Sequence, residues 1–201
     1  PRLRDRRIVA KDFFRDDSPG FRSKEDRGTY DFVVGNPPWG DDTVDGSKFA
    51  GSWAGTHSWR TTNGDIGPLF LAKASVLAKK EECGTVSLLQ PAMVLLFNRS
   101  PTALDLRKKL FSEFAVQEVV NLSAVRFELF NNAVAPTCLV TFENKRPTAD
   151  ATLEYVCPKP LKTSEDKFRV VIEPQDIHTI RLSEAATDEL VWTALAWGGA
   201  R

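Results

Sequence analysis

Short apolar runs alternate with amphipathic segments along the first 145 residues of the chain, and Gly, Pro or Asn separates most of them. The apolar runs predict β-strands at residues 7–10, 30–35, 85–90, 116–122 and 133–142. Apolar residues at helical spacing predict two α-helices, over 69–80 and 101–111. The stretch 40–67 is long and rich in Gly, Ser, Thr and Asp, and we expect it to be a loop. Strands that alternate with helices in this order indicate an α/β sheet.

Local signals predict where the helices begin. Asp65 is a plausible N-cap with Pro68 in the first turn of one helix, and Ser100 followed by Pro101 favours the start of the other. Between the last two of these strands the chain has no helical segment. Because a parallel pair needs a connection of a dozen or more residues, we expect these two strands to be antiparallel neighbours.

For two tryptophans and one arginine, the sequence favours a structural role over a role in binding. Trp53 and Trp59 lie in the long polar stretch, where they could close over a substrate or anchor the loop, and anchoring is favoured. Arg107 could contact phosphates, but its place within a helix favours a surface or structural role.

The sequence pattern changes after Lys145. Residues 146–148, Arg-Pro-Thr, are typical of a boundary. Beyond them we expect strands at 153–156 and 168–172 and a terminal helix at 183–197. The chain is therefore expected to have two parts, residues 1–145 and residues 146–201.

Composition narrows the function classes. Lysine plus arginine and aspartate plus glutamate both number 27, so no basic surplus of the kind that most self-sufficient DNA-binding domains show is present. No apolar run approaches the roughly 18 residues that a membrane span needs, and no signal peptide opens the chain. The three cysteines form no CxxC pair, and the two histidines are far apart, so we expect reduced thiols, no metal site and a cytoplasmic protein without membrane contact.

The tetrapeptide Asn36-Pro37-Pro38-Trp39 directly follows the apolar run at 30–35. Open α/β sheets bind ligands at the carboxyl ends of their strands, so this loop stands where a site is expected. Two consecutive prolines fix the backbone and remove two N–H donors, which leaves a stiff loop that presents mainly acceptors. The alternative is a plain turn in which Trp39 fills the core.

This tetrapeptide resembles the motif of S-adenosylmethionine-dependent amino-methyltransferases, and most closely that of the N6-adenine DNA methyltransferases of large restriction–modification systems. Weaker features in the same order extend the resemblance over about residues 7–143. It implies a Rossmann-like methyltransferase sheet with an antiparallel final strand. It also implies methyl transfer from S-adenosylmethionine to an adenine flipped out of double-stranded DNA, in restriction–modification or phage defence.

The resemblance gives each residue of the motif a role. An exocyclic amino nitrogen is a poor nucleophile, and two acceptors aimed at its N–H groups stabilise the charge that develops on it. The side-chain oxygen of Asn36 and the backbone carbonyl of Pro37 would be these acceptors. Pro38 would shape the loop, and Trp39 would stack on the flipped base.

Two further positions resemble binding residues of the family. Asp12 and Phe13 follow the first expected strand, where the family carboxylate accepts a hydrogen bond from the cofactor adenine and the aromatic ring packs on it. Phe130 resembles the aromatic residue that packs on the target base opposite the Pro-Pro loop. From the residues alone, Asp12 could instead cap a loop, and Phe13 and Phe130 could be core residues.

The family's Gly-rich turn and the acidic residue that bind the methionine and ribose of the cofactor are not found before Asn36. We therefore expect 1–145 to be a partial catalytic domain that lacks the first strands, and the isolated chain to be inactive. Residues 146–201 would lead toward a specificity domain or subunit. Two alternatives stay open: an RNA or protein-glutamine methyltransferase, and a non-catalytic methyltransferase-like scaffold subunit.

Overall fold

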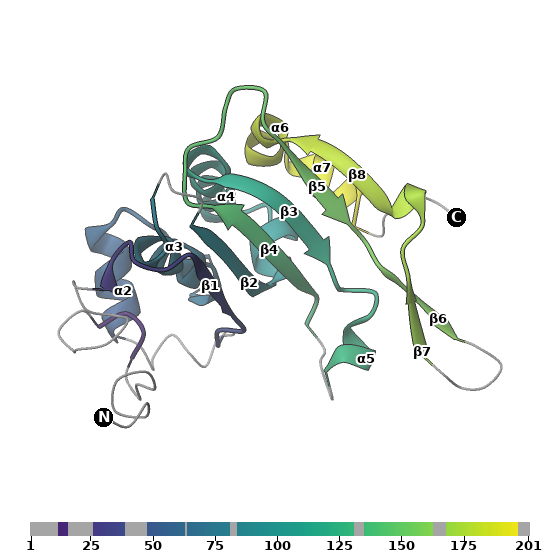
Figure 1. Cartoon of the computed structure of the whole chain (residues 1–201), viewed down its shortest axis with the longest axis horizontal. Coiled ribbons are helices and arrows are strands. Elements are labelled where there is room, and N and C mark those ends of the chain that lie inside the picture. Colours follow the sequence, from purple (N-terminus) through teal and green to yellow (C-terminus); the bar gives the residue numbers. More distant parts are fainter. Residues whose placement is uncertain are drawn as a thin grey trace.

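The computed structural model describes residues 12–15, 26–38, 48–62, 64–80, 84–130, 135–162 and 168–196, and its centre is a six-stranded sheet (Figure 1). In spatial order the strands are β1 (Phe32–Gly35), β2 (Thr85–Pro91), β4 (Thr137–Glu143), β3 (Ala115–Asn121), β5 (Thr152–Val156) and β8 (Ile177–Arg181). β1, β2, β3 and β5 run in one direction, and β4 and β8 run in the other. The expected antiparallel pairing of the strands at 116–122 and 133–142 is confirmed by β3 and β4.

Most of the helices lie on one face of the sheet, as Figure 1 shows for α4, α6 and α7. The helices are α2 (Lys48–Thr56), α3 (Gly67–Leu77), the π-helix η3 (Met93–Phe97), α4 (Pro101–Glu113), α5 (Arg126–Leu129), the 3₁₀ turn η4 (Pro174–Asp176), α6 (Leu182–Thr187) and α7 (Glu189–Ala194). A separate hairpin consists of β6 (Lys159–Lys162) and β7 (Phe168–Val171). The two helices expected near 69–80 and 101–111 are confirmed by α3 and α4, and the Ser100 hydroxyl accepts a hydrogen bond from the Ala103 amide as an N-cap.

The long polar stretch is not a loop throughout, because α2 forms within it. Ala50, Trp53 and Ala54 are buried and recur at helical spacing, so one face of α2 packs into the core. Trp53 and Trp59 are both buried, which confirms that they anchor this segment. The rings of Trp59 and Phe114 are parallel with centroids 6.3 Å apart, which joins the segment to the end of α4.

The expected terminal helix is divided at Asp188. The Asp188 amide donates to the Glu184 carbonyl at the end of α6, and its carboxylate accepts from the Leu190 amide at the start of α7. One residue thus ends a helix with its backbone and caps the next with its side chain, and a single helix at 183–197 was a wrong expectation.

The segments after residue 146 continue the sheet and its core. β5 pairs with β3, and Trp192 of α7 stacks on Phe111 of α4 with ring centroids 5.4 Å apart. The division of the chain at 145/146 stays a prediction about domain organisation.

Candidate functional site

Four strands end at the same edge of the sheet, which we call the carboxyl edge. β1 pairs in parallel with β2 so that Gly35 lies opposite Leu88, and Asn36 follows directly. On the next strands Gln90 and Asn121 are both opposite Cys138 of β4. The residues that follow β1, β2 and β3 therefore meet at one edge, as ligand-binding residues do in open α/β sheets.

The loop after β1 presents its polar groups to solvent. Asn36 and Pro38 are exposed, and Pro37 is half-buried. Within the described residues, the Asn36 side chain has no hydrogen-bond partner. Its amide oxygen is therefore available as an acceptor at the carboxyl edge. Trp39 lies outside the described residues.

Asp12 and Phe13 lie in a tight turn. The Asp12 carboxylate accepts a hydrogen bond from the Phe14 amide at 2.8 Å, and its carbonyl accepts from the Arg15 amide at 3.3 Å. Asp12 thus has the loop-capping role. Phe14 is 4% exposed, whereas Phe13 is half-buried and its ring stacks on Phe70 with centroids 5.1 Å apart. Phe14 is the core residue of this pair, and Phe13 lies at the border of the core.

Helix α3 brings this turn to the carboxyl edge. The amides of Thr29 and Tyr30, just before β1, donate to the Leu77 carbonyl at the end of α3. The helix therefore runs opposite to β1, and its first turn, with Phe70, lies toward the edge that holds Asn36. Asp65 fixes this first turn, because its carboxylate accepts from the Gly67 amide at 2.7 Å. It acts one residue before the N-cap, which is Ile66.

Phe130 reaches the same edge from the connection between β3 and β4. It is half-buried and is the C-cap of α5, where its amide donates to the carbonyl of Arg126, the first residue of that helix. β4 is two strands from β1, which is roughly 10 Å at ordinary strand spacing. The topology thus places Asn36, Phe13 and Phe130 around one edge.

Two buried polar residues behind this edge were not singled out for the site. Gln90 is the last residue but one of β2, where its Nε2 donates to the Leu89 carbonyl and its Oε1 has no partner among the described residues. Arg107 donates to the carbonyls of Leu95 at 3.1 Å and Asn98 at 2.7 Å, which holds η3 after β2.

The expected structural role of Arg107 is confirmed. Burial lowers the pKa of its guanidinium, and the charge of Glu189 opposes that shift. Arg107 shares the buried stripe of α4 with Ala103, Leu110 and Phe111. The helical spacing of these buried residues is the sequence signal from which the burial of Arg107 could have been predicted.

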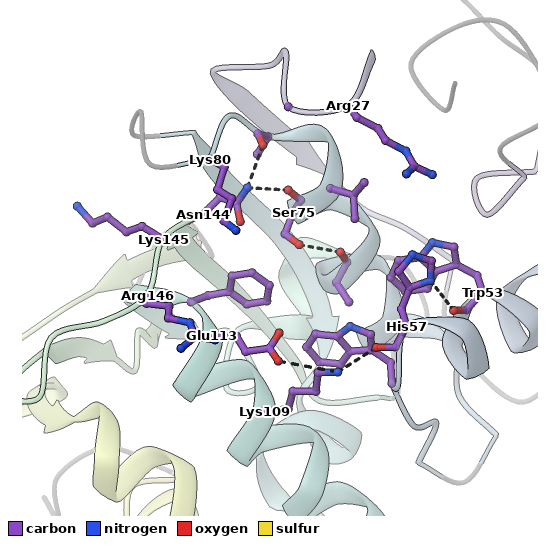
Figure 2. A pocket seen from close by; sticks show the side chains of 16 residues that line it. Arg27, Trp53, His57, Ser75, Lys80, Lys109, Glu113, Asn144, Lys145 and Arg146 are labelled. Atoms are coloured by element: carbon purple, nitrogen blue, oxygen red, sulfur yellow. Dashed lines mark hydrogen bonds and ion pairs between the residues drawn. The ribbon is translucent and has the colours of Figure 1, made fainter. Parts of the chain in front are cut away.

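A cavity of about 620 Å³ opens at the opposite edge, beside the ends of α3 and α4 (Figure 2). Lys109 donates to the carbonyls of His57 at 3.0 Å and Ser58 at 2.9 Å, which joins α4 to the segment after α2. Asn144 donates to the Ser75 carbonyl at 2.7 Å and holds the last turn of α3. These groups serve the fold, and none of the expected site residues that the structure describes lines the cavity.

Comparison with known proteins places these features in a family. Residues 4–127 match the Eco57I restriction-modification methylase family. A putative type II restriction enzyme and methyltransferase from Methanocaldococcus jannaschii is 26% identical over 141 residues, which are 70% of this chain and 11% of that protein.

Two solved structures have a similar fold. The methyltransferase subunit of a type I restriction-modification system from Streptococcus thermophilus has a TM-score of 0.57 at 16% identity, over 87% of this chain and 39% of that one. A modification subunit of a putative type I restriction enzyme from Vibrio vulnificus has a TM-score of 0.58 at 16% identity, over 81% and 35%.

These matches confirm the expected methyltransferase sheet and the resemblance to restriction–modification methyltransferases. The chain spans 11% of the length of the curated relative and 39% of the Streptococcus subunit. In the part of the chain that the structure describes, no helix is both long and apolar enough to cross a bilayer.

Proposed function

The chain belongs to the Eco57I restriction-modification methylase family, and we propose that the complete natural polypeptide methylates N6 of adenine in double-stranded DNA. The observation that carries this proposal is Asn36, an exposed side chain directly after β1 that has no hydrogen-bond partner among the described residues. An acceptor held at the carboxyl edge of the sheet is what recognition of an amino group requires.

The chemistry follows from the acceptors of the loop. The Asn36 oxygen and the Pro37 carbonyl accept hydrogen bonds from the two N–H groups of adenine N6. These bonds localise the nitrogen lone pair and stabilise the positive charge of the transition state. Pro37 and Pro38 keep the loop rigid, so little reorganisation is needed during the reaction. Trp39 and Phe130 stack on the two faces of the flipped base.

S-adenosylmethionine, which methyltransferases of this family generally use, supplies the methyl group when it is bound. We propose that Phe13 packs on its adenine ring and that Asp12 accepts a hydrogen bond from the adenine amino group. Phe13 fits this task because its ring is supported by Phe70 and only half-buried. A carboxylate has about four acceptor sites, so Asp12 can serve the Phe14 amide and a ligand together.

Sequence recognition is assigned to another part of the system. Because the chain carries no net charge, we propose that a specificity domain or subunit supplies most of the DNA contacts. Residues 1–145 would contribute to the catalytic domain, and 146–201 would lead toward the specificity module. The system would act in restriction–modification or phage defence.

The test is methyl transfer from labelled S-adenosylmethionine to DNA by the complete natural polypeptide, with chromatography of the product nucleosides. We expect N6-methyladenine, and a loss of roughly a hundredfold or more in kcat for Asn36→Ala. Gln117→Ala removes an exposed carboxamide on β3 and should have no effect. A methylated cytosine, or full activity of Asn36→Ala, would overturn the proposal. Transfer to RNA or to a protein glutamine would change the substrate class, and failure to bind the cofactor would favour a scaffold.

A further inference from the structure

Helix α5 exposes large apolar side chains at the carboxyl edge. Phe127 is 60% exposed and Leu129 is 45% exposed, and no residue of this short helix is buried. The preceding residue, Val125, is buried, and its carbonyl accepts from the Glu128 and Leu129 amides, which attaches the helix to a buried residue. Figure 1 shows α5 beyond the end of β3, outside the layer of strands. α5 is thus a firmly attached apolar projection.

Position distinguishes this projection from an ordinary exposed apolar residue. α5 lies in the connection between β3 and β4, and its C-cap residue is Phe130, the candidate contact to the target base. The connection leaves the sheet at the edge where Asn36 follows β1. Phe127 therefore lies three residues before the candidate base contact, in a connection that leaves the sheet at the edge of Asn36.

A cation orders the Phe127 ring. The guanidinium carbon of Arg126 lies 4.1 Å from the ring centroid, and Nη1 of Arg126 donates to the Ser123 carbonyl. The arginine is thus held from one side by the backbone and covers the ring from the other. An ordered apolar ring next to a positive charge suits a ligand with stacked bases and a phosphate backbone.

We infer that Phe127 inserts into the DNA duplex at the target site and fills the space that the flipped adenine leaves. Apolar side chains that enter base steps offset part of the cost of unstacking, and Phe is among the residues used for this. Arg126 lies beside it to meet the phosphate backbone. The inference rests on the proposed function and adds to it a residue that opens the duplex.

The experiment compares two duplexes that carry the target site, located by sequencing methylated DNA. In one duplex the target adenine is paired, and in the other it faces an abasic position and leaves the stack easily. For the complete natural polypeptide, Phe127→Ala should lower kcat/KM about tenfold or more on the paired duplex, and less than about threefold on the abasic one. Leu190→Ala is the control, because Leu190 on α7 is 57% exposed, and it should change neither value.

A conservative variant and a second readout keep folding effects apart. Phe127→Leu keeps an apolar side chain and should retain most of the rate on the paired duplex. Fluorescence of 2-aminopurine at the target position reports extrusion of the base without chemistry, and it should fall in Phe127→Ala. Equal losses on both duplexes, or no loss on either, would overturn the inference. Asn36→Ala tests the proposed function separately, because it should lower transfer to both duplexes by roughly a hundredfold or more while leaving the 2-aminopurine signal.

Discussion

Phe13 and Phe14 are adjacent in sequence, and a pair of substitutions can separate their roles. Phe14 packs on Phe70 and Trp53, with ring centroids 4.9 Å and 5.7 Å away. Phe13 stacks on Phe70 and is half-buried. We expect Phe14→Ala to destabilise the fold and Phe13→Ala to weaken binding of S-adenosylmethionine.

The magnitudes differ enough to be measured. Truncation of a buried Phe to Ala costs roughly 3–5 kcal/mol in free energy of unfolding. Phe13 loses about half of the roughly 1.5–3 kcal/mol that full burial of such a side chain contributes, which is about 1 kcal/mol. Stacking of a base on an aromatic ring contributes about 1–3 kcal/mol. Loss of the Phe13 ring should therefore raise the Kd of the cofactor by about 5- to 150-fold.

Urea denaturation measures the first effect, and titration calorimetry of the complete natural polypeptide with S-adenosylmethionine measures the second. Phe14→Leu serves in the binding experiment, because it keeps most of the core volume and should bind the cofactor with unchanged Kd. Weaker binding in Phe14→Leu together with an unchanged Kd in Phe13→Ala would refute the assignment of the stacking ring to Phe13.

Two further predictions concern buried groups behind the site. Arg107→Met leaves the Leu95 and Asn98 carbonyls without their donor and should lower the free energy of unfolding by about 1–3 kcal/mol in urea; wild-type stability would mean that the carbonyls find other donors. Burial raises the pKa of the Cys138 thiol far above its usual range. The thiol ionises at about pH 8.5 in the unfolded chain but stays neutral in the folded one, so the free energy of unfolding should fall above that pH by up to about 1.4 kcal/mol per pH unit. Urea denaturation between about pH 8 and 10 should show a smaller fall for Cys138→Ala. An equal fall in the variant would contradict the Cys138 assignment.

The buried strands and helices could be predicted from sequence, because central strands are short apolar runs and a helix with one buried face has apolar residues at helical spacing. Elements at the periphery could not. β8 is mostly exposed at one end of the sheet, so its pattern is weak. In α2 the apolar residues Ala50, Trp53 and Ala54 alternate with Gly, Ser and Lys. The polar composition of the segment therefore favoured a loop, although the spacing of these three residues is helical. The break at Asp188 arises because this residue is both the C-cap of α6 and the N-cap of α7. Helix propensity, which describes residues inside a helix, does not predict such a break.

The candidate site was predictable where it is local in sequence. Asn36 follows β1 directly, so the apolar run before it fixed its place at the carboxyl edge. The approach of Phe13 to that edge depends on its contact with Phe70, 57 residues further along the chain, and no local pattern contains such a contact. Periodicity also could not distinguish Phe13 from Phe14, because a turn of four residues has no period. The resemblance to the family made that distinction.

The strand that leads into Asn36 has no buried residue. β1 lies at the end of the sheet and pairs with β2 alone among the described strands, and Phe32 and Val34 are 70% and 73% exposed. The start of β1 is joined to the segment after α3 by the Lys79 amide, which donates to the Tyr30 carbonyl at 2.8 Å, and by the Lys79–Asp31 ion pair. Its end, which leads into Asn36, has the support of β2 on one side. Preorganised acceptors work because they do not move when charge develops. The contribution to catalysis that we propose for Asn36 therefore depends on how firmly two parts of β1 are held in the complete natural polypeptide: its apolar face, and the side that pairs with no described strand.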